Sequence, residues 1–416
     1  MNGWREVAVE ALCSRVTSGG TPSRKRADYF ADEGIPWVKS QELVGARITA
    51  TEEHISEAGL KSSSAKLLPR DTVLLAMYGA NVGQLGWLGV EATVNQAICA
   101  MVTDPKETDS RFLYYALAGA RERLVGNAHG AAQQNLSQQL IKPFKLAVPA
   151  LATQQRIGEI LRSIDDLIEN NRRRVEMLEE MARAIYHEWF VKFRYPGHED
   201  VPMVDSALGP IPEGWEVQPL AAIATVNGSS RKPGGDEVFR YLDISALSER
   251  HIGELEAIGG SSAPGRARRV VSPGDTVWAT VRPNRRAHAL LVAPDSDWIA
   301  STGLAVLTPS TVSPDFLFET SSATAFSDWL VGRATGSAYP AVRAKDFEEA
   351  PIVVPDVAVD AAFADKVSPM HDLSWRLRNE CSRLAALRDL LLPKLVTGQI
   401  DISTLDLDAL VARQVA

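Results

Sequence analysis

Cysteine is scarce in this chain of 416 residues, which has only Cys13, Cys99 and Cys381. The three lie far apart and form no CxxC pair, so the sequence supports neither a disulfide framework nor a zinc ribbon, and a reducing compartment is expected. The seven histidines show no ligand spacing such as HExxH. We therefore expect no metal site.

Long hydrophobic runs are also missing. No stretch approaches the roughly 18 continuous apolar residues that a transmembrane helix needs. The first residues, MNGWREVAVEALC, lack the basic segment and apolar run of a secretory signal. We therefore expect a cytoplasmic protein without membrane contact. The net charge of −8 argues against indiscriminate binding to polyanions and leaves room only for local basic patches.

The motifs that most often carry catalysis are absent as well. The chain has no GxxxxGK[ST] phosphate loop, because no Gly is followed by Lys, and it has no GxSxG nucleophile elbow. No Asn is followed by Pro, which excludes the Asn-Pro-Pro-aromatic site of amino-methyltransferases. We therefore expect no enzyme and no catalytic residue in this chain.

The strongest positive signal is a long helix between Thr153 and Phe190. Its seam residues recur at alternating intervals of four and three, and no Pro or Gly interrupts it after Gly158. Such a heptad repeat predicts a coiled-coil helix. The seam consists of Ile157, Leu161, Ile164, Ile168, Asn171, Val175, Leu178, Ala182, Ile185 and Trp189.

The same seam returns 206 residues later, weaker at Ser374 and Arg388. Two long helices whose apolar stripes are too narrow to bury alone most simply bury them against each other. The alternative is that each helix lies on its own globular domain. The second seam consists of Phe363, Val367, Met370, Ser374, Leu377, Cys381, Leu384, Arg388, Leu391 and Leu395.

The rest of the chain is also doubled, which is the signature of a repeat architecture. LPRDTV at 68–73 recurs as SPGDTV at 272–277, an offset of 204. Short apolar runs bounded by turn residues predict strands, and Asp109 is expected to cap a helix that runs to about Val125. We predict an α+β fold with two mixed α/β domains. The predicted parts are a first domain at 1–150, a helix at 151–193, a proline-rich linker at 194–212, a second domain at 213–356, a helix at 357–402 and a tail at 403–416.

Basic, amide and aromatic residues cluster in the predicted loops. Between Arg266 and His288 there are six Arg against the single acid Asp275. Arg and Lys neutralise phosphates, and Arg, Asn and Gln also pair with base edges, so these clusters indicate nucleic-acid binding. The alternative is a solvated loop. The candidates are Arg24, Lys25, Arg26, Tyr78, Asn81, Gln84, His129, Gln133, Gln134 and Asn135 in the first half, and Arg231, Lys232, Arg266, Arg268, Arg269, Arg282, Asn284, Arg285, Arg286, Tyr339, Arg343 and Lys345 in the second.

At this point the order of motifs resembles the specificity subunit of Type I restriction-modification systems, across essentially the whole chain. The most specific motif is the end, LAALRDLLLPKLVTGQI at 384–400. One departure is that PAVR at 340–343 replaces QNLS at 134–137 in the second half. The other similar motifs are GANVG at 79–83, VNQA at 94–97, QQRI at 154–157, WFVKF at 189–193 and PEGW at 212–215.

The resemblance implies two target-recognition domains, each reading one half of a bipartite double-stranded DNA site, separated by a long antiparallel two-helix coiled coil with a pseudo-twofold repeat. It also implies two methyltransferase subunits and an endonuclease/translocase subunit as partners. S-adenosylmethionine and Mg/ATP would be bound by those partners, with no cofactor in this chain. We expect the partners to dock at Trp189, Phe190, Leu391 and Leu395. A rival hypothesis is a coiled-coil scaffold with two protein- or glycan-binding domains, whose arginines keep it in solution.

Overall fold

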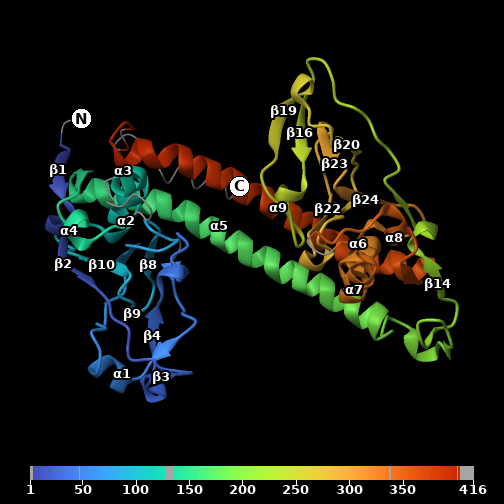
Figure 1. The fold of residues 1–416 in the computed structure, drawn as a ribbon, viewed down its shortest axis with the longest axis horizontal. Coiled ribbons are helices and arrows are strands. Elements are labelled where there is room, and N and C mark those ends of the chain that lie inside the picture. The colour runs from blue at the N-terminus through green and yellow to red at the C-terminus, as the bar shows by residue number, and fades with distance from the viewer. Residues whose placement is uncertain (1–2, 46, 127–134, 337–338, 401, 403–416) are drawn as a thin grey trace. The chain divides into compact units, whose positions relative to one another are not determined.

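The computed structural model describes residues 3–45, 47–126, 135–336, 339–400 and 402 (Figure 1). The chain forms two compact units. Unit 1 comprises Met1–Ile168 and Arg383–Ala416, and unit 2 comprises Glu169–Ser382. Each of the two long helices therefore contributes one part to each unit. None of the helices in the described residues is long and apolar enough to cross a membrane.

Unit 1 is built on a five-stranded sheet in the order β2-β10-β7-β8-β5 and a four-stranded sheet in the order β3-β6-β4-β9. A further pair, β1 with β11, brings the two ends of the first domain together. The strands are β1 (Arg5–Ala8), β2 (Cys13–Ser18), β3 (Phe30–Ala31), β4 (Ile35–Val38), β5 (Arg47–Ile48), β6 (His54–Ile55), β7 (Val73–Ala76), β8 (Leu85–Leu88), β9 (Thr93–Val94), β10 (Ile98–Thr103) and β11 (Lys145–Val148).

Strand β7 shows why this sequence forms a buried central strand. Its four residues are all buried, and successive side chains point to opposite faces of the sheet. Val73 and Leu75 join one core, whereas Leu74 and Ala76 join another. A continuous apolar run therefore serves a sheet that is covered on both sides.

Helix α2 packs on the larger sheet of unit 1, whereas α1 packs on β6 of the smaller sheet. Helix α2 begins where the sequence predicts, because the Asp109 carboxylate accepts hydrogen bonds from the amides of Arg111 and Phe112 at 3.0 and 3.1 Å. It contacts β7 and β8. The helices are α1 (Glu57–Lys61), α2 (Ser110–Gly119), α3 (Arg121–Gly126), α4 (Gln138–Ile141) and the first part of α5 (Leu151–Tyr186).

Unit 2 repeats this plan. Its sheet β15-β24-β21-β22 has the strand order of β2-β10-β7-β8, and its sheet β19-β16-β23-β20 keeps one parallel pair, β16 with β23, that corresponds to β4 with β9. The pair β14 with β25 corresponds to β1 with β11. The strands are β12 (Met203–Val204), β13 (Ile211–Pro212), β14 (Glu216–Pro219), β15 (Ala224–Val226), β16 (Val238–Leu242), β17 (Leu247–Ser248), β18 (His251–Ile252), β19 (Glu256–Gly259), β20 (Ala267–Val270), β21 (Thr276–Ala279), β22 (His288–Leu290), β23 (Trp298–Ser301), β24 (Leu304–Pro309) and β25 (Pro351–Val354).

The helices of unit 2 follow the same pattern. Helix α6 packs on β21, β22 and β24, as α2 packs on its sheet in unit 1. The mixture of helices and sheets fits the predicted α+β class, and the predicted domains 1–150 and 213–356 fall within units 1 and 2 respectively. The helices are α6 (Pro314–Ser322), α7 (Thr324–Arg333), α8 (Ala344–Glu348) and α9 (Val357–Val396).

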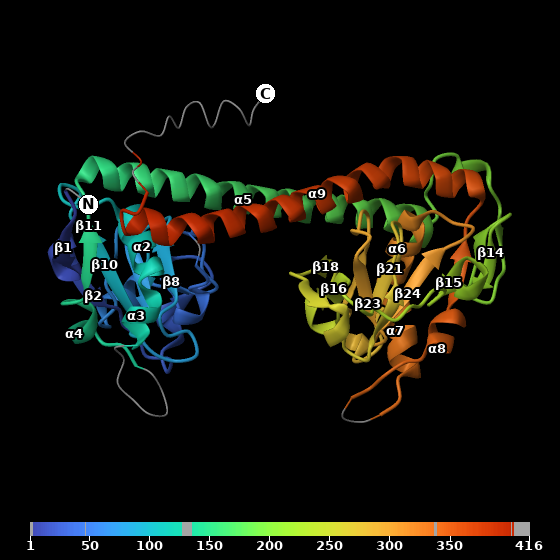
Figure 2. The same ribbon diagram turned by 90° about the horizontal axis from the view of Figure 1, so that it is seen from above.

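The predicted seam of the long helices is largely buried. In unit 1, Ile157 and Leu161 of α5 share a core with Leu395 of α9. In unit 2, Ala182 of α5 shares a core with Phe363 of α9. Figure 2 shows α5 and α9 as continuous helices along their whole length. The heptad spacing thus predicts both helices and their inward faces.

Helix α5 ends in a π-helical turn, His187–Val191. The neighbouring residues Trp189 and Phe190 are both buried in the core of unit 2. In an α-helix, adjacent side chains point about 100° apart, and the wider π turn changes this phase. The turn therefore places two consecutive aromatic rings in one core.

The segment predicted as a linker, 194–212, is a packed part of unit 2. Tyr195 is buried and stacks on Trp215, with 5.1 Å between ring centroids. Strands β12 and β13 pair within it, and Ile211 is buried. Its prolines end the helical periodicity, as the sequence indicates, but its aromatic and aliphatic side chains fold it onto the unit.

Candidate functional site

The turn between β7 and β8 carries the first group of candidate residues. Gly79 and Gly83 have φ of 88° and 77°, and a Cβ on Gly83 would lie 2.5 Å from Val125, so this tight turn requires glycine there. Tyr78 is exposed. Asn81 donates from Nδ2 to the Ser40 carbonyl at 3.2 Å, which holds the turn.

A second segment joins this turn. The Leu136 amide donates to the Met77 carbonyl at 2.7 Å, which brings the exposed Asn135 to the β7 end of the turn that also carries the half-buried Gln84. Tyr78, Asn81, Gln84 and Asn135 are thus brought together in unit 1. The predicted residues His129, Gln133 and Gln134 lie outside the described residues.

The corresponding turn of unit 2, between β21 and β22, has a different composition. It contains a short 3-10 helix, η9 (Pro283–Arg285), between Arg282 and Arg286, whose φ values are 54° and 52°. The Arg282 amide donates to the Pro340 carbonyl at 2.7 Å, and its guanidinium lies 4.7 Å from the ring centre of Tyr339. Asn284 and Arg285 are exposed at the tip.

The segment after Tyr339 adds two cations to the same region. Arg343 is the N-cap residue of α8, and 81% of its side chain is exposed. Lys345 lies 3.4 Å from Glu349 and is also exposed. The Val342 amide donates to the Thr280 carbonyl at 2.9 Å, which ties this segment to the β21–β22 turn. The β21–β22 turn and the segment tied to it therefore carry Arg282, Asn284, Arg285, Tyr339, Arg343 and Lys345.

Arg286 differs from its neighbours, because its guanidinium is engaged within unit 2. It donates from Nη2 to the Ser322 carbonyl at 2.6 Å and from Nη1 to the Thr324 hydroxyl at 3.2 Å, and its Nε lies 3.1 Å from Glu249. These contacts occupy its nitrogens within unit 2, and its predicted DNA contact stays a prediction. Its fork holds the turn.

His288 fixes the end of the same turn. Its ring stacks on Trp278, with centroids 4.6 Å apart, and burial lowers the pKa of His288 to about 3. The imidazole is therefore neutral near pH 7, and its Nδ1–H donates to the Arg286 carbonyl at 2.6 Å. Sequence reasoning counted this histidine only as the end of a basic run.

A separate basic group lies along β20. The Arg231 amide donates to the Arg268 carbonyl at 2.8 Å, and the Arg231 guanidinium pairs with Glu237. The Thr302 amide donates to the Arg266 carbonyl, and the Thr280 amide donates to the Gly303 carbonyl, so the β23–β24 connection links this group to the η9 turn. The group consists of Arg231, Lys232, Arg266, Arg268 and Arg269.

The basic run of unit 1 is partly neutralised by acids of the same unit. Arg24 pairs with Glu53 and lies 4.4 Å from the ring centre of Phe30. Arg26 pairs with Asp28 at 2.7 Å, and Lys25 is exposed. Exposed ion pairs of this kind contribute little free energy, so a phosphate can compete for either arginine.

Three of the four predicted partner-binding residues are buried inside the units. Trp189 and Phe190 are 7% and 6% exposed in the core of unit 2. Leu395 is 2% exposed in the core of unit 1, and Leu391 packs against the same core. This corrects the prediction for Trp189, Phe190 and Leu395, because their side chains meet the protein's own core. The prediction for Leu391, which is half-buried, stays a prediction. The seam pattern identifies buried positions, not exposed ones.

A buried ionic cluster links the β17–β18 turn, α6 and α9 of unit 2. Arg250, in the β17–β18 turn, donates to Glu319 of α6 at 3.0 and 2.5 Å. His371 of α9 contacts Glu319 at 2.8 Å and Asp315 at 2.6 Å. Burial alone would raise the pKa of Glu319, but Arg250 and His371 lower it to about 2. Burial alone would lower the pKa of His371, but the two carboxylates raise it.

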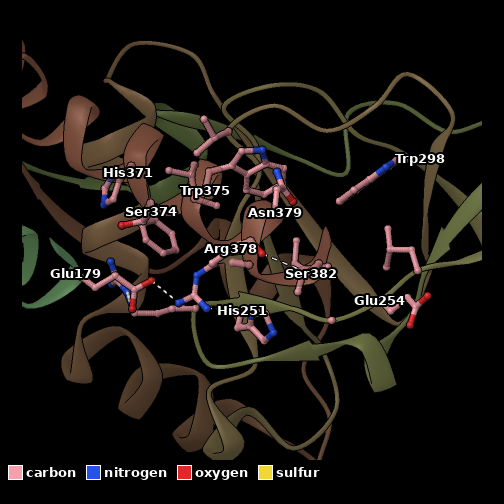
Figure 3. Close-up of a pocket in the computed structure, with 18 of the residues that line it drawn as sticks. Glu179, His251, Glu254, Trp298, His371, Ser374, Trp375, Arg378, Asn379 and Ser382 are labelled. Carbon is pink, nitrogen blue, oxygen red and sulfur yellow. Dashed lines mark hydrogen bonds and ion pairs between the residues drawn. The ribbon is translucent and has the colours of Figure 1, made fainter. Parts of the chain in front are cut away.

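A cavity of about 370 Å³ lies beside this cluster (Figure 3). It is lined by residues of α9, of the β17–β18 hairpin and of neighbouring strands, among them Trp298, Trp375 and Arg378. In Figure 3, Arg378 reaches Glu179, with which it pairs at 2.6 Å. The cavity contains none of the predicted site residues. Among the described residues, no group of three or more His, Cys, Asp or Glu has the arrangement of a metal site.

Two features of the site were missed by sequence reasoning. The first is Gln96, an exposed residue in the β9–β10 connection that accepts a hydrogen bond from the Thr21 hydroxyl. Its neighbour Ala97 accepts from the Met77 amide through its carbonyl, which places Gln96 near the β7–β8 turn. The polar pair Asn95-Gln96 between two apolar runs indicates a turn with exposed amide groups, and it could have identified Gln96 from the sequence. Glu249 gave no signal, because its partner Arg286 is distant in sequence.

Comparison with known proteins finds similar sequences and a similar structure. Residues 1–180 match the family described as the Type I restriction modification DNA specificity domain. The Type I restriction enzyme MjaIX specificity subunit of Methanocaldococcus jannaschii is 25% identical over 402 residues, which cover 94% of this chain and 92% of that protein. The EcoR124I/EcoR124II specificity subunit of Escherichia coli is 27% identical over 155 residues, covering 36% of this chain and 38% of that protein.

Among solved structures, the S subunit of a Type I restriction-modification system from M. genitalium has the same fold, with a TM-score of 0.64. It is 16% identical in sequence, and the match covers 95% of this chain and 96% of that one.

Proposed function

We infer that this chain is a specificity subunit of the Type I restriction-modification kind and recognises a DNA sequence. The carrying observation is that units 1 and 2 share a strand order yet place different chemistry on equivalent turns. Unit 1 presents Tyr78 and Asn135, whereas unit 2 presents Arg282, Asn284 and Arg285. A shared scaffold with divergent exposed loops suits two readers of different sequences.

We propose that the DNA site is bipartite and double-stranded, that each unit reads one half of it, and that α5 and α9 together form the antiparallel coiled coil that separates the two readers. The pairing of α5 with α9 inside each unit supports this, because Asp165 meets Arg388 in unit 1 and Glu179 meets Arg378 in unit 2. On both helices the partner number falls as the residue number rises, which is the antiparallel sense.

The catalysis that follows recognition is proposed to belong to partner subunits. Two methyltransferase subunits would bring S-adenosylmethionine and modify adenines, and an endonuclease/translocase subunit would use Mg/ATP for cleavage. This chain would act without a cofactor and without catalytic residues. The absence of phosphate-loop and methyltransferase motifs from its sequence supports this division of labour.

The affinity for DNA measured against salt concentration tests the function. Phosphate contacts by Arg and Lys release counterions, so log K should fall steeply with log salt. Duplexes carrying the recognised site should in addition bind more tightly than scrambled duplexes of equal length at every salt concentration. Binding without any sequence preference would contradict the proposal.

The rival scaffold hypothesis is not favoured by the comparisons. It makes the opposite prediction, a chain whose DNA binding is negligible at every salt concentration. Replacing residues 1–150 by those of a relative adds a second test. Mapping methylated adenines in cells should then show one half of the site changed and the other half retained, and a change in both halves would argue against independent readers.

A further inference from the structure

The hairpin of β17 and β18 in unit 2 turns through two residues, Glu249 and Arg250, that point in different directions. Arg250 has φ of 57°, and 3% of its side chain is exposed. It holds Glu319 with both terminal nitrogens, and its Nε lies 3.8 Å from Glu179 of α5. The hairpin is therefore anchored to α6 and to the long helix α5.

Glu249 reaches the opposite way, to the η9 turn. Its side chain is 49% exposed and lies 3.1 Å from the Nε of Arg286. Its backbone also forms a parallel bridge to His288, the residue whose imidazole donates to the Arg286 carbonyl. The hairpin thus touches the end of the η9 turn by backbone and by side chain.

The η9 turn needs such support. Arg282 and Arg286 flank it in the left-handed region, where residues with a Cβ are strained. A strained conformation persists only where the surroundings determine it from several sides. Arg282 is fixed by Pro340 and Tyr339, and Arg286 by Ser322, Thr324 and Glu249.

An acid beside a DNA-reading turn calls for an explanation, because it repels phosphates and reduces the local positive charge. The ion pair between Glu249 and Arg286 explains why the acid is there. The contact orients a guanidinium whose other two nitrogens hold the end of α6 and the start of α7.

We propose that Glu249 is a positioning residue for specificity in the second half-site, an inference that rests on the proposed function. By holding Arg286, it sets the orientation at which Asn284 and Arg285 meet base edges. It contacts no DNA itself. Its loss blurs the sequence preference of unit 2 and leaves that of unit 1 unchanged.

The test compares Glu249→Gln and Glu249→Ala with the matched control Glu254→Gln. Glu254 is exposed in the same unit, so the control removes the same charge away from Arg286. The full chain, purified with its methyltransferase subunits, is offered the recognised duplex and duplexes with one base changed in either half-site. Discrimination at one or more second-half positions should fall about 5-fold or more, the low end of what a lost base contact costs.

Three further readouts separate positioning from general damage. Discrimination in the first half-site should stay at the parental level. The thermal midpoint of unfolding should shift no more than in Glu254→Gln, because Glu249 is half-exposed. Glu249→Asp, which keeps the charge, should recover part of the lost discrimination.

Parental discrimination in both Glu249→Gln and Glu249→Ala would overturn the inference while leaving the proposed function intact. An equal loss in Glu254→Gln would overturn it in favour of a simple charge effect. A parent chain that shows no sequence preference in either half-site would instead overturn the proposed function, and this inference with it.

Discussion

Units 1 and 2 tie the helix on their sheet to a long helix at the same place but with opposite chemistry. In unit 1, Tyr115 of α2 donates to Asp165 of α5 at 2.6 Å. In unit 2, the corresponding contact joins Glu319 of α6 to His371 of α9 at 2.8 Å. The acid lies on the long helix in one unit and on the sheet-packed helix in the other. Both units therefore make a polar contact at this place, but with different residue types.

The surroundings of the two contacts differ in burial. Asp165 also meets Arg388, whose side chain is 30% exposed. Glu319 also meets Arg250, whose side chain is 3% exposed. Charges that are more deeply buried are stabilising only while each is paired, so the contact in unit 2 is the more vulnerable of the two.

The largest difference should follow from removing the cation in each unit. Arg250→Met leaves Glu319 short of its main partner in a buried site, and we expect a loss of about 3–5 kcal/mol in the free energy of unfolding. Urea unfolding measures it, and hydrogen exchange in α6 should report the loss within unit 2. The matched change Arg388→Met should cost clearly less, because Asp165 keeps its bond from Tyr115 and is partly solvated. Equal costs would show that the burial difference carries no energetic weight.

The two contacts should also differ in their response to pH. The pKa of His371 is raised in the folded state, so its contribution is fully present below the unfolded value of about 6.5 and is lost as the pH rises through the folded value. Each unit of that rise is worth about 1.4 kcal/mol. In unit 1, burial and then Asp165 raise the pKa of Tyr115, so its hydroxyl stays protonated between pH 6 and pH 9.

Urea unfolding between pH 6 and pH 9 measures the effect, with exchange in α6 and α2 as reporters for the two units. Unit 2 should weaken as the pH rises, and His371→Gln should flatten its profile. A parental profile in that variant would assign the pH dependence to other groups.

The equivalent turns should differ in which half-site they affect. Arg285 is exposed at the tip of the η9 turn, and Arg285→Ala should cost about 1–3 kcal/mol of binding if it reads a base, with relaxed preference at one position of the second half-site only. Competition with singly substituted duplexes measures it. Arg376→Ala, an equal charge change on an exposed face of α9, serves as the control and should leave the preference unaltered. Relaxation in the first half-site would contradict the assignment.

The smallest expected effect is that of Tyr115→Phe. It removes one hydrogen bond, and Asp165 remains paired with Arg388, so the loss should be about 0.5–1.5 kcal/mol. Chemical unfolding followed in α2 measures it. A cost as large as that of Arg250→Met would mean that the contact in unit 1 is as critical as the one in unit 2.

The regular parts of the fold follow from the sequence because they depend on periodicity and local turn chemistry. The heptad seam predicts α5 and α9, and Asp109 caps α2 as expected. The repeat at an offset of 204–206 predicts that unit 2 reproduces the strand order of unit 1. The seam and the cap depend on residues that are close together in the sequence, and the repeat depends on comparing one half of the sequence with the other.

The roles of single charged residues do not follow, because they depend on partners that are distant in the chain. Arg285 and Arg286 are neighbours, yet one is exposed and the other is held by Ser322 and Glu249. Arg250 lies in a short surface-like turn of the sequence but is buried against Glu319, 69 residues away. The composition of the sequence reveals a basic cluster. Which of its side chains are exposed to a ligand depends on their hydrogen bonds and ion pairs with residues that are distant in the chain.

The π turn at the end of α5 has a consequence for how this protein tolerates insertions and deletions. An extra residue in a regular helix rotates everything beyond it by about 100° and would turn a seam outward. A π turn absorbs one such residue locally. Because His187–Val191 lies after the last residue of α5, a change of length there leaves the preceding 36-residue helix in phase. A one-residue change of length at this join would therefore leave α5 in phase and act instead on Trp189 and Phe190 in the core of unit 2.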